Sequence, residues 1–354
     1  MNQNELKLSY PFDGIEPSPG NAFEILPGVK WIKMPLPFAL NHINLWLVKD
    51  EFQGKKGWAI VDCGIAKDPV KELWEKIFEQ ELEGLPVTRV IVTHMHPDHV
   101  GLAGWLCEKW QVPLFMSMTD YMVSKLWTAN STAGAGTGGE MAVEHFARHG
   151  LIDKEAQEKI RQRANYYPGL VSKPPSSYYR LMDGQQIKLG DFVWELISGY
   201  GHAPEHIALF CPSLNLLISG DMILPKISTN VSVFDYEPEA NPLPLYLESL
   251  NKYDHIPEDV LVLPSHGRPF RGIHERIRQQ HEHHKERLEE VWSMCETPAT
   301  VSEIVPKMFK RELDLHQLTF AMGEALAHLN ALYFEGKLKR LVDEQGIYRF
   351  QQIN

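Results

Sequence analysis

Six consecutive positions, from His94 to His99, hold three histidines and one aspartate in the pattern His-x-His-x-Asp-His. Imidazole and carboxylate groups are among the side chains that bind divalent transition metals in proteins. The run follows a β-branched segment at residues 87–92 that is typical of a buried strand, and an apolar helical pattern begins at Val100. The spacing therefore predicts a metal site at the end of a strand. A solvated histidine-rich loop is the alternative, but such loops rarely lie between a buried strand and an apolar helix.

The ligands in this run are predicted to form two sets. His94 and His96 are two residues apart, so in an extended backbone they point the same way. Pro97 breaks the extension, and Asp98 and His99 follow it where the helix begins, so the second pair can face a different point. Two sets of ligands favour two metal ions.

At these residues the chain resembles the metallo-β-lactamase superfamily, because residues 93–101 match its signature Thr-His-x-His-x-Asp-His-x-Gly without a gap. The resemblance implies three further ligands downstream, and the matching positions are His202, Asp221 and His266. It implies that the first metal is held by His94, His96 and His202. It implies that the second metal is held by Asp98, His99 and His266, and that Asp221 bridges the two.

The resemblance implies an α/β fold, the four-layer αββα metallo-β-lactamase sandwich, over residues 1–296. Residues 119–179 interrupt its strand patterns with three helical patterns and a glycine-rich run, and we expect them to form a helical cap insertion. Residues 297–354 contain helical stretches followed by two short strands, which resembles a small winged-helix-like domain. Within the superfamily, this order is similar to the lactamase-beta-2-like and hydroxyacylglutathione-hydrolase-like proteins.

The activity that the resemblance implies is hydrolysis of an ester-like bond, with a hydroxide that bridges two metals as the nucleophile. Asp98 and Asp221 are expected to be catalytic as well as ligands, because each can orient the attacking water through a free carboxylate oxygen. The ligand set suits zinc, which is the default divalent ion, and also iron or manganese. The commonest true β-lactamases lack the equivalent of His99 and have a cysteine at the position of Asp221, so antibiotic hydrolysis is not expected.

A thioester or a lactone is the favoured small-molecule substrate. The formal net charge of -11 disfavours a nucleic acid, although a phosphodiesterase or ribonuclease stays as an alternative. Within the cap, Tyr166 and Tyr167 are the expected substrate contacts, because long excursions of this kind are typical of lids. A winged-helix regulatory protein with a degenerate hydrolase core is a further alternative, which the intact ligand set argues against.

Composition sets the remaining expectations. A chain of 354 residues with 44% hydrophobic residues can bury one large core and a small one. No apolar run long enough for a signal peptide or a membrane span is present, so we expect a cytoplasmic protein with no membrane partner. The four scattered cysteines are expected to be buried free thiols. Oligomeric state, a homo-oligomer included, is left open.

A second group of histidines lies on a predicted long helix at residues 271–294. The four are His274, His281, His283 and His284. Because they do not all share one helical face and charged residues surround them, we interpret this helix as solvated rather than as a second metal site.

Overall fold

The structure is a computed structural model that describes residues 5–129 and 137–353. The chain divides into two compact units, each assembled from three separate segments. The first unit consists of Met1–Ala129, Gly169–Thr229 and Lys252–Ile277. The second unit consists of Asn130–Pro168, Asn230–Asn251 and Arg278–Asn354.

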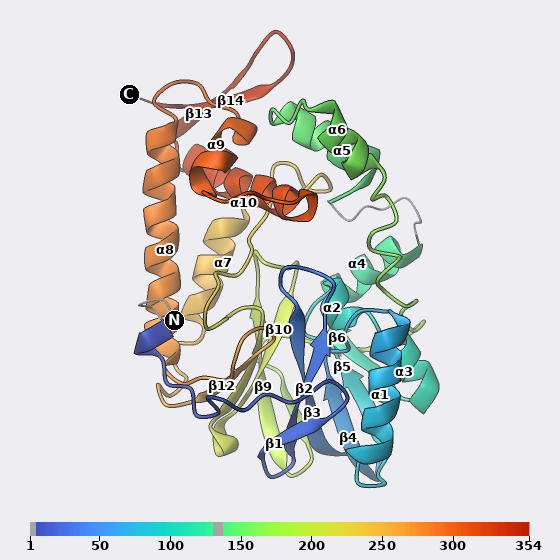
Figure 1. Cartoon of the computed structure of the whole chain (residues 1–354). Helices are drawn as coiled ribbons and strands as arrows, with labels where there is room; N and C mark the ends of the chain where they lie inside the picture. Colours follow the sequence, from blue (N-terminus) through green and yellow to red (C-terminus); the bar gives the residue numbers. More distant parts are fainter. Residues whose placement is uncertain (1–4, 130–136, 354) are drawn as a thin grey trace. The chain divides into compact units, whose positions relative to one another are not determined.

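The first unit, part of which is labelled in Figure 1, contains a seven-stranded sheet. The spatial order of its strands follows the sequence. Its strands are β1 (Ala22–Leu26), β2 (Val29–Pro35), β3 (His42–Phe52), β4 (Lys55–Val61), β5 (Val87–Ile91), β6 (Leu114–Ser117) and β7 (Tyr179–Leu181). Strands β1 to β4 form an antiparallel meander, whereas β4 to β7 pair in parallel. Parallel neighbours need crossover connections, which here include the helices α1 (Asp68–Gln80), α2 (Pro97–Val100) and α3 (Ala103–Trp110).

A five-stranded sheet completes the first unit, in the order β12-β11-β10-β9-β8. Its strands are β8 (Gln186–Leu189), β9 (Phe192–Gly199), β10 (His206–Cys211), β11 (Leu216–Gly220) and β12 (Leu261–Pro264). All its pairs are antiparallel except β11 with β12, which is parallel. The short 3-10 helices Glu5–Lys7 and Pro212–Leu214 also belong to this unit.

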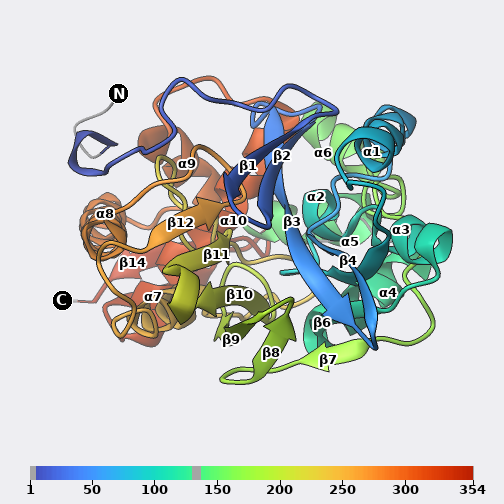
Figure 2. The same ribbon diagram turned by 90° about the horizontal axis from the view of Figure 1, so that it is seen from below.

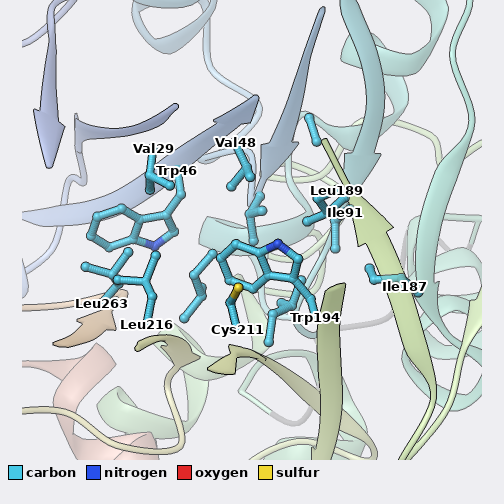
Figure 3. Packing of buried hydrophobic residues seen from close by; sticks show 14 of the residues in the cluster. Val29, Trp46, Val48, Ile91, Ile187, Leu189, Trp194, Cys211, Leu216 and Leu263 are labelled. Atoms are coloured by element: carbon cyan, nitrogen blue, oxygen red, sulfur yellow. The ribbon is translucent and has the colours of Figure 1, made fainter. Parts of the chain in front are cut away.

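The hydrophobic core lies between the two sheets. Trp46 and Val48 of β3 are two residues apart and share one face of the strand, and Trp194 and Leu196 of β9 do the same in the other sheet. Figure 3 shows Trp46 and Trp194 within this layer. Burying each such side chain contributes about 1.5–3 kcal/mol, so this layer stabilises the contact between the sheets.

The outer face of the seven-stranded sheet is also buried. Leu45 and Leu47, which alternate with the core residues of β3, are fully buried. Helices α1 and α3 run along this sheet (Figures 1 and 2), and α1 turns Val70, Trp74 and Ile77 inward. The predicted α/β sandwich of two sheets with helices is therefore confirmed.

The second unit is mostly helical. Its helices are α5 (Gly139–Arg148), α6 (Lys154–Arg161), α7 (Pro242–Asn251), α9 (Val301–Met308), α10 (Leu315–Phe334) and the part of α8 (Ile273–Met294) from Arg278 onward. Thr300 and Asp314 each begin a helix with a reciprocal capping box. The hairpin β13 (Leu338–Val342) and β14 (Tyr348–Gln352) follows α10. Two helices followed by a hairpin match the expected order of elements, while the winged-helix comparison stays a prediction.

The expected cap is divided between the two units. Its first helix is α4 (Met118–Ala129) of the first unit, whereas α5 and α6 belong to the second. Most of the glycine-rich run, residues 130–136, lies outside the described residues. The boundary expected at residue 296 also stays a prediction. The part of α8 from Arg278 onward lies in the same compact unit as the segment after it.

The interpretation of the long helix as solvated is wrong for His284. Its side chain is fully buried, and its Nδ1 lies 3.2 Å from Nε2 of His328 in a hydrogen bond. Gln280, His284 and Val291, which are four and seven residues apart, form a buried stripe on α8. The charged neighbours obscured this period in the sequence.

All four cysteines are buried and unbridged, as expected. Within the described ranges 5–129 and 137–353, no helix has both the length and the apolar character that a membrane crossing requires.

Candidate metal centre

The His94–His99 loop follows β5 after two intervening residues, at the edge of the sheet where the parallel strands terminate. His96 keeps an extended backbone and is the N-cap of α2, and Pro97 is its first residue. Asp98 and His99 therefore project from the first turn of a short helix, whereas His96 projects from extended chain. The change of direction predicted at Pro97 is confirmed.

The first ligand set is brought together from three segments of the first unit. His94 Nε2 lies 2.9 Å from His96 Nδ1 and 3.2 Å from His202 Nε2. His202 Nε2 lies 3.4 Å from Asp221 Oδ2. Four ligands at about 2.0–2.1 Å around a tetrahedral zinc ion would be about 3.3–3.4 Å from one another. These four side chains thus have the spacing that a shared metal ion requires, and they form one of two potential metal-binding groups in the described residues.

The second group contains Asp98, His99 and His266. Asp98 Oδ2 lies 3.3 Å from His266 Nε2 and 3.6 Å from His99 Nε2. Asp221 reaches this group too, because its Oδ1 lies 3.6 Å from the Nε2 atoms of both His99 and His266. Its carboxylate therefore presents one oxygen to each group of ligands.

Two polar atoms at the centre of the cluster lack a hydrogen-bond partner. They are His99 Nε2 and Asp221 Oδ1, and both are buried. Leaving a buried polar atom unpaired costs about 1–3 kcal/mol, so such atoms usually have a ligand, an ion or water as their partner. Their positions, and the spacing of the other donors, fit divalent metal ions at this site.

A layer of hydrogen bonds behind the ligands fixes their orientation. Asp62, at the end of β4, accepts a hydrogen bond from His99 Nδ1 at 2.8 Å and another from the Thr93 hydroxyl at 2.8 Å. His266 Nδ1 donates to the carbonyl oxygen of His42 at 2.8 Å. In both histidines Nδ1 is the donor of these bonds, which points Nε2 into the cluster, where it can bind a metal ion once the ring is neutral.

Sequence reasoning missed three buried residues around the ligands. Asp62 could have been found, because it follows an apolar strand that is parallel to the one that leads to His94. The other two are His206, whose Nε2 accepts the backbone N–H of Asp221 at 3.2 Å, and Asp120, which accepts backbone N–H groups from two ligand loops. The role of Asp120 left no signal in the sequence, because its partners are far away along the chain.

Two histidine pKa values are lowered in the first ligand group and two are raised in the second, because burial dominates in one and neighbouring carboxylates dominate in the other. Burial, together with the neighbouring histidines, lowers the pKa of His94 well below its ordinary value, and burial lowers that of His96 to about 3. Burial also opposes the charged form of His99, but the carboxylates of Asp98, Asp221 and Asp62 outweigh it and raise its pKa well above the ordinary value. The site thus favours positive charge where His99 and His266 meet the carboxylates.

The two carboxylates respond in the opposite sense. Burial raises the pKa of Asp98, but His99 and His266 outweigh this effect and lower it to about 2. The same two histidines hold the pKa of Asp221 well below its usual range despite burial. Both carboxylates are therefore anionic at neutral pH and suited to hold a cation.

Tyr166 and Tyr167, the expected substrate contacts, belong to the second unit. Tyr167 is almost fully buried. The ring of Tyr166 lies 4.7 Å from the Arg163 guanidinium and 5.8 Å from the His316 ring. Their role toward a substrate stays a prediction.

Comparison with known proteins identifies two matching families. Residues 40–266 match the model of the metallo-beta-lactamase superfamily, and residues 288–353 match that of the metallo-beta-lactamase-like C-terminal domain. A probable metallo-hydrolase of Bacillus subtilis, YqjP, is 23% identical over 325 residues, which cover 90% of this chain and 96% of that protein. A hydroxyacylglutathione hydrolase of Haemophilus influenzae, GloC, is 22% identical over 66% of this chain and 89% of its own length.

Solved structures give the same result. A beta-lactamase domain protein from Burkholderia ambifaria is 52% identical and superposes with a TM-score of 0.93 over 99% of this chain and 100% of its own. A metallo-beta-lactamase family protein from Thermus thermophilus is 27% identical, with a TM-score of 0.76 over 93% of this chain and 100% of its own. The chain therefore belongs to the metallo-beta-lactamase superfamily, as a metal-dependent hydrolase with a potential metal-binding cluster of histidines and aspartates.

Proposed function

We propose that this protein hydrolyses an ester-like bond, in a thioester or a lactone, with a pair of divalent metal ions held by the seven ligands. The observation that carries this proposal is the placement of Asp221, whose two carboxylate oxygens face different ligand groups. One shared carboxylate between two groups of ligands is the arrangement that a dinuclear site needs. Zinc is the default ion, because imidazole and carboxylate ligands at these separations suit it.

When bound, such ions supply Lewis acidity and lower the pKa of water so that hydroxide forms near neutral pH. The chain's own residues provide orientation. Asp98 directs Oδ2 toward His266 and His99, which leaves Oδ1 to accept a hydrogen bond from the attacking water. With a pKa of about 2, its carboxylate is a weak base, so it orients the water and does not keep its proton.

The substrate class rests on charge and on one relative. The formal net charge of -11 repels a polyphosphate, which favours a small acyl substrate over a nucleic acid. The relative from Haemophilus influenzae is named as a hydroxyacylglutathione hydrolase, and we extend thioester hydrolysis to this chain as part of the proposal. A small-molecule substrate, a cytoplasmic location and zinc all remain predictions.

The test combines metal analysis with a substrate screen. Protein purified without chelator should contain close to two transition-metal ions per chain, and it should hydrolyse thioester or lactone reporters faster than phosphodiester ones. A metal content near zero after growth with added zinc would refute the metal centre. Preference for the phosphodiester reporter would instead assign the site to the phosphodiesterase class.

Replacing the bridging ligand tests the same proposal at one residue. Asp221→Ala removes the carboxylate shared by both groups, so we expect the metal content to fall and kcat/KM to drop by at least about 100-fold, as loss of an electrostatic stabiliser does. Ser213→Ala changes an exposed residue of the same unit and serves as the control. Unchanged metal content and kcat/KM in Asp221→Ala would contradict the assignment of the bridge.

A further inference from the structure

Asp120 is a fully buried carboxylate in the first unit that belongs to neither potential metal-binding group. It is the third residue of α4, the helix that follows directly on β6. Its two oxygens accept hydrogen bonds from two different loops. Oδ1 accepts the backbone N–H of Met95 at 2.8 Å, and Oδ2 accepts the backbone N–H of Glu205 at 2.6 Å.

Both N–H groups lie within the loops that carry the first ligand set. Met95 is the residue between His94 and His96. Glu205 lies three residues after His202. One side chain therefore connects the backbone beside two ligands to the backbone beside the third, although these loops are about a hundred residues apart along the chain.

Neighbouring contacts hold this carboxylate in place. The hydroxyl of Ser117 lies 3.3 Å from Asp120 Oδ2. The side chain of Glu205 in turn accepts hydrogen bonds from Thr119, from its hydroxyl at 3.1 Å and from its backbone N–H at 3.4 Å. The side chains of Asp120 and Glu205 thus link the start of α4 to the His202 loop. When Asp120 is ionised, its bonds from the backbone N–H groups of Met95 and Glu205 are charge-assisted.

We propose that Asp120 is a positioning residue that holds His94, His96 and His202 at the mutual distances a shared metal ion requires. It touches no metal ligand side chain, so it acts through the backbone of the loops. Without it, the His202 loop and the His94–His96 loop lose a common anchor, and the 3.2 Å separation between His94 Nε2 and His202 Nε2 is no longer enforced. This inference rests on the metal centre of the proposed function.

The test is Asp120→Asn, compared with Asp50→Asn as a matched control. Asparagine has the same shape, but its NH2 group cannot accept the second backbone N–H. Asp50 is also a buried carboxylate of the first unit, and its oxygens accept hydrogen bonds from the Thr88 hydroxyl at 2.6 Å and from the backbone of Gly190 at 3.2 Å. It also forms a buried ion pair with the Arg89 guanidinium, which donates to both oxygens at 2.6 Å and 2.9 Å, so Asp50→Asn is expected to destabilise the unit at least as much as Asp120→Asn. Its loss perturbs folding of the same unit at a place that contacts none of the ligand loops.

Two measurements separate positioning from general stability. Zinc affinity is measured on the full-length chain by competition with a chromophoric chelator, and the coordination geometry by the visible absorption of the Co²⁺-loaded protein. We expect Asp120→Asn to weaken zinc binding by about 10–100-fold, as loss of an outer-shell partner does, and to alter the Co²⁺ spectrum. Asp50→Asn should lower the melting temperature and leave the zinc affinity within about twofold and the spectrum unchanged.

A second pair of substitutions, each of which removes only one hydroxyl, is used if Asp120→Asn does not fold. Ser117→Ala removes only the hydroxyl beside Asp120, and Thr88→Val removes only the hydroxyl beside Asp50. The first should weaken zinc binding and shift the Co²⁺ spectrum, and the second should do neither. Equal zinc affinity and equal spectra in the two members of a pair would overturn the inference. Absence of any Co²⁺ or zinc binding by the unmodified chain would instead refute the proposed function itself, and this inference with it.

Discussion

At the scale of single residues, Asp62 orients a predicted metal ligand, although it belongs to neither group of ligands itself. Its carboxylate joins Thr93 and His99, and so fixes the imidazole whose Nε2 is left unpaired in the centre. Asp62→Asn would place an amide NH2 or a weaker acceptor opposite His99 Nδ1, and the preferred tautomer of the ring would no longer be enforced.

We therefore expect Asp62→Asn to lose the metal of the second group first. Titration of the purified variant with zinc should give one ion bound with nearly normal affinity and a second bound about 10–100-fold more weakly. Equal weakening of both would show that Asp62 supports the whole loop rather than His99. Asp183→Asn, an exposed carboxylate that bonds Lys252 elsewhere in this unit, is the control.

The protonation of His99 and His266 gives a further prediction at this scale. In the metal-free chain both pKa values are raised, so both rings hold protons at pH values where an ordinary histidine, with a pKa of about 6.5, would already have lost them. A metal ion must displace these protons, so its affinity should increase as pH rises. The limit is about tenfold per pH unit for each proton released.

Isothermal titration calorimetry of zinc binding in two buffers with different ionisation enthalpies measures the released protons directly. We expect a net release near neutral pH. A zinc affinity that stays constant between about pH 6 and 8, with no proton release, would contradict the raised pKa values of His99 and His266.

The residues that sequence reasoning found and missed differ in a physical way. The ligands from His94 to His99 lie within one run of six residues, so their types and spacing are visible in the sequence. The family resemblance extends the set to His202, Asp221 and His266. Asp120 acts between residues 25 positions before it and 85 positions after it. Such pairs are created by folding and leave no local pattern.

At the scale of elements, α8 shows how a buried face can be hidden by charge. His284 faces inward and contacts His328 of α10, and the Tyr246 ring of α7 lies 5.7 Å away. Burial lowers the pKa of His284 to about 2 and that of His328 to about 4. Both rings are therefore neutral in the folded chain, whereas in the unfolded chain they protonate near pH 6.5.

This difference makes the second unit sensitive to acid. Because the folded pKa values are lower, the unfolded chain binds more protons below about pH 6.5, and stability is lost as the pH falls. Each histidine can contribute up to about 1.4 kcal/mol per pH unit between its folded and unfolded pKa values. Urea unfolding at about pH 7 and pH 5 should show a smaller loss in His284→Gln than in the unmodified chain. An equal loss in both would mean that other groups carry the acid sensitivity.

At the scale of the whole chain, composition correctly predicted enough apolar residues for a large core, and the family resemblance predicted the sandwich. The assembly of each compact unit from three segments was not predictable in this way. Hydrophobic periodicity describes which face of an element is buried, but it does not say which distant segment buries it. The segment at residues 119–179 is an example: it was expected to form a single cap, and the structure divides it between the two units.

The metal centre itself should contribute to the stability of the first unit, because its ligands come from four separate places along the chain. They follow β5, precede β10, and lie at the ends of β11 and β12. An ion that binds only the folded arrangement stabilises it by an amount that grows with the logarithm of its concentration, about 4 kcal/mol at a thousand times its Kd.

Removing the ions with a chelator should therefore lower the melting temperature, and added zinc should restore it. Asp221→Ala, which cannot bridge the two groups, should melt at nearly the same temperature with and without chelator. A chelator effect of equal size in both proteins would place the stabilising metal somewhere other than this cluster.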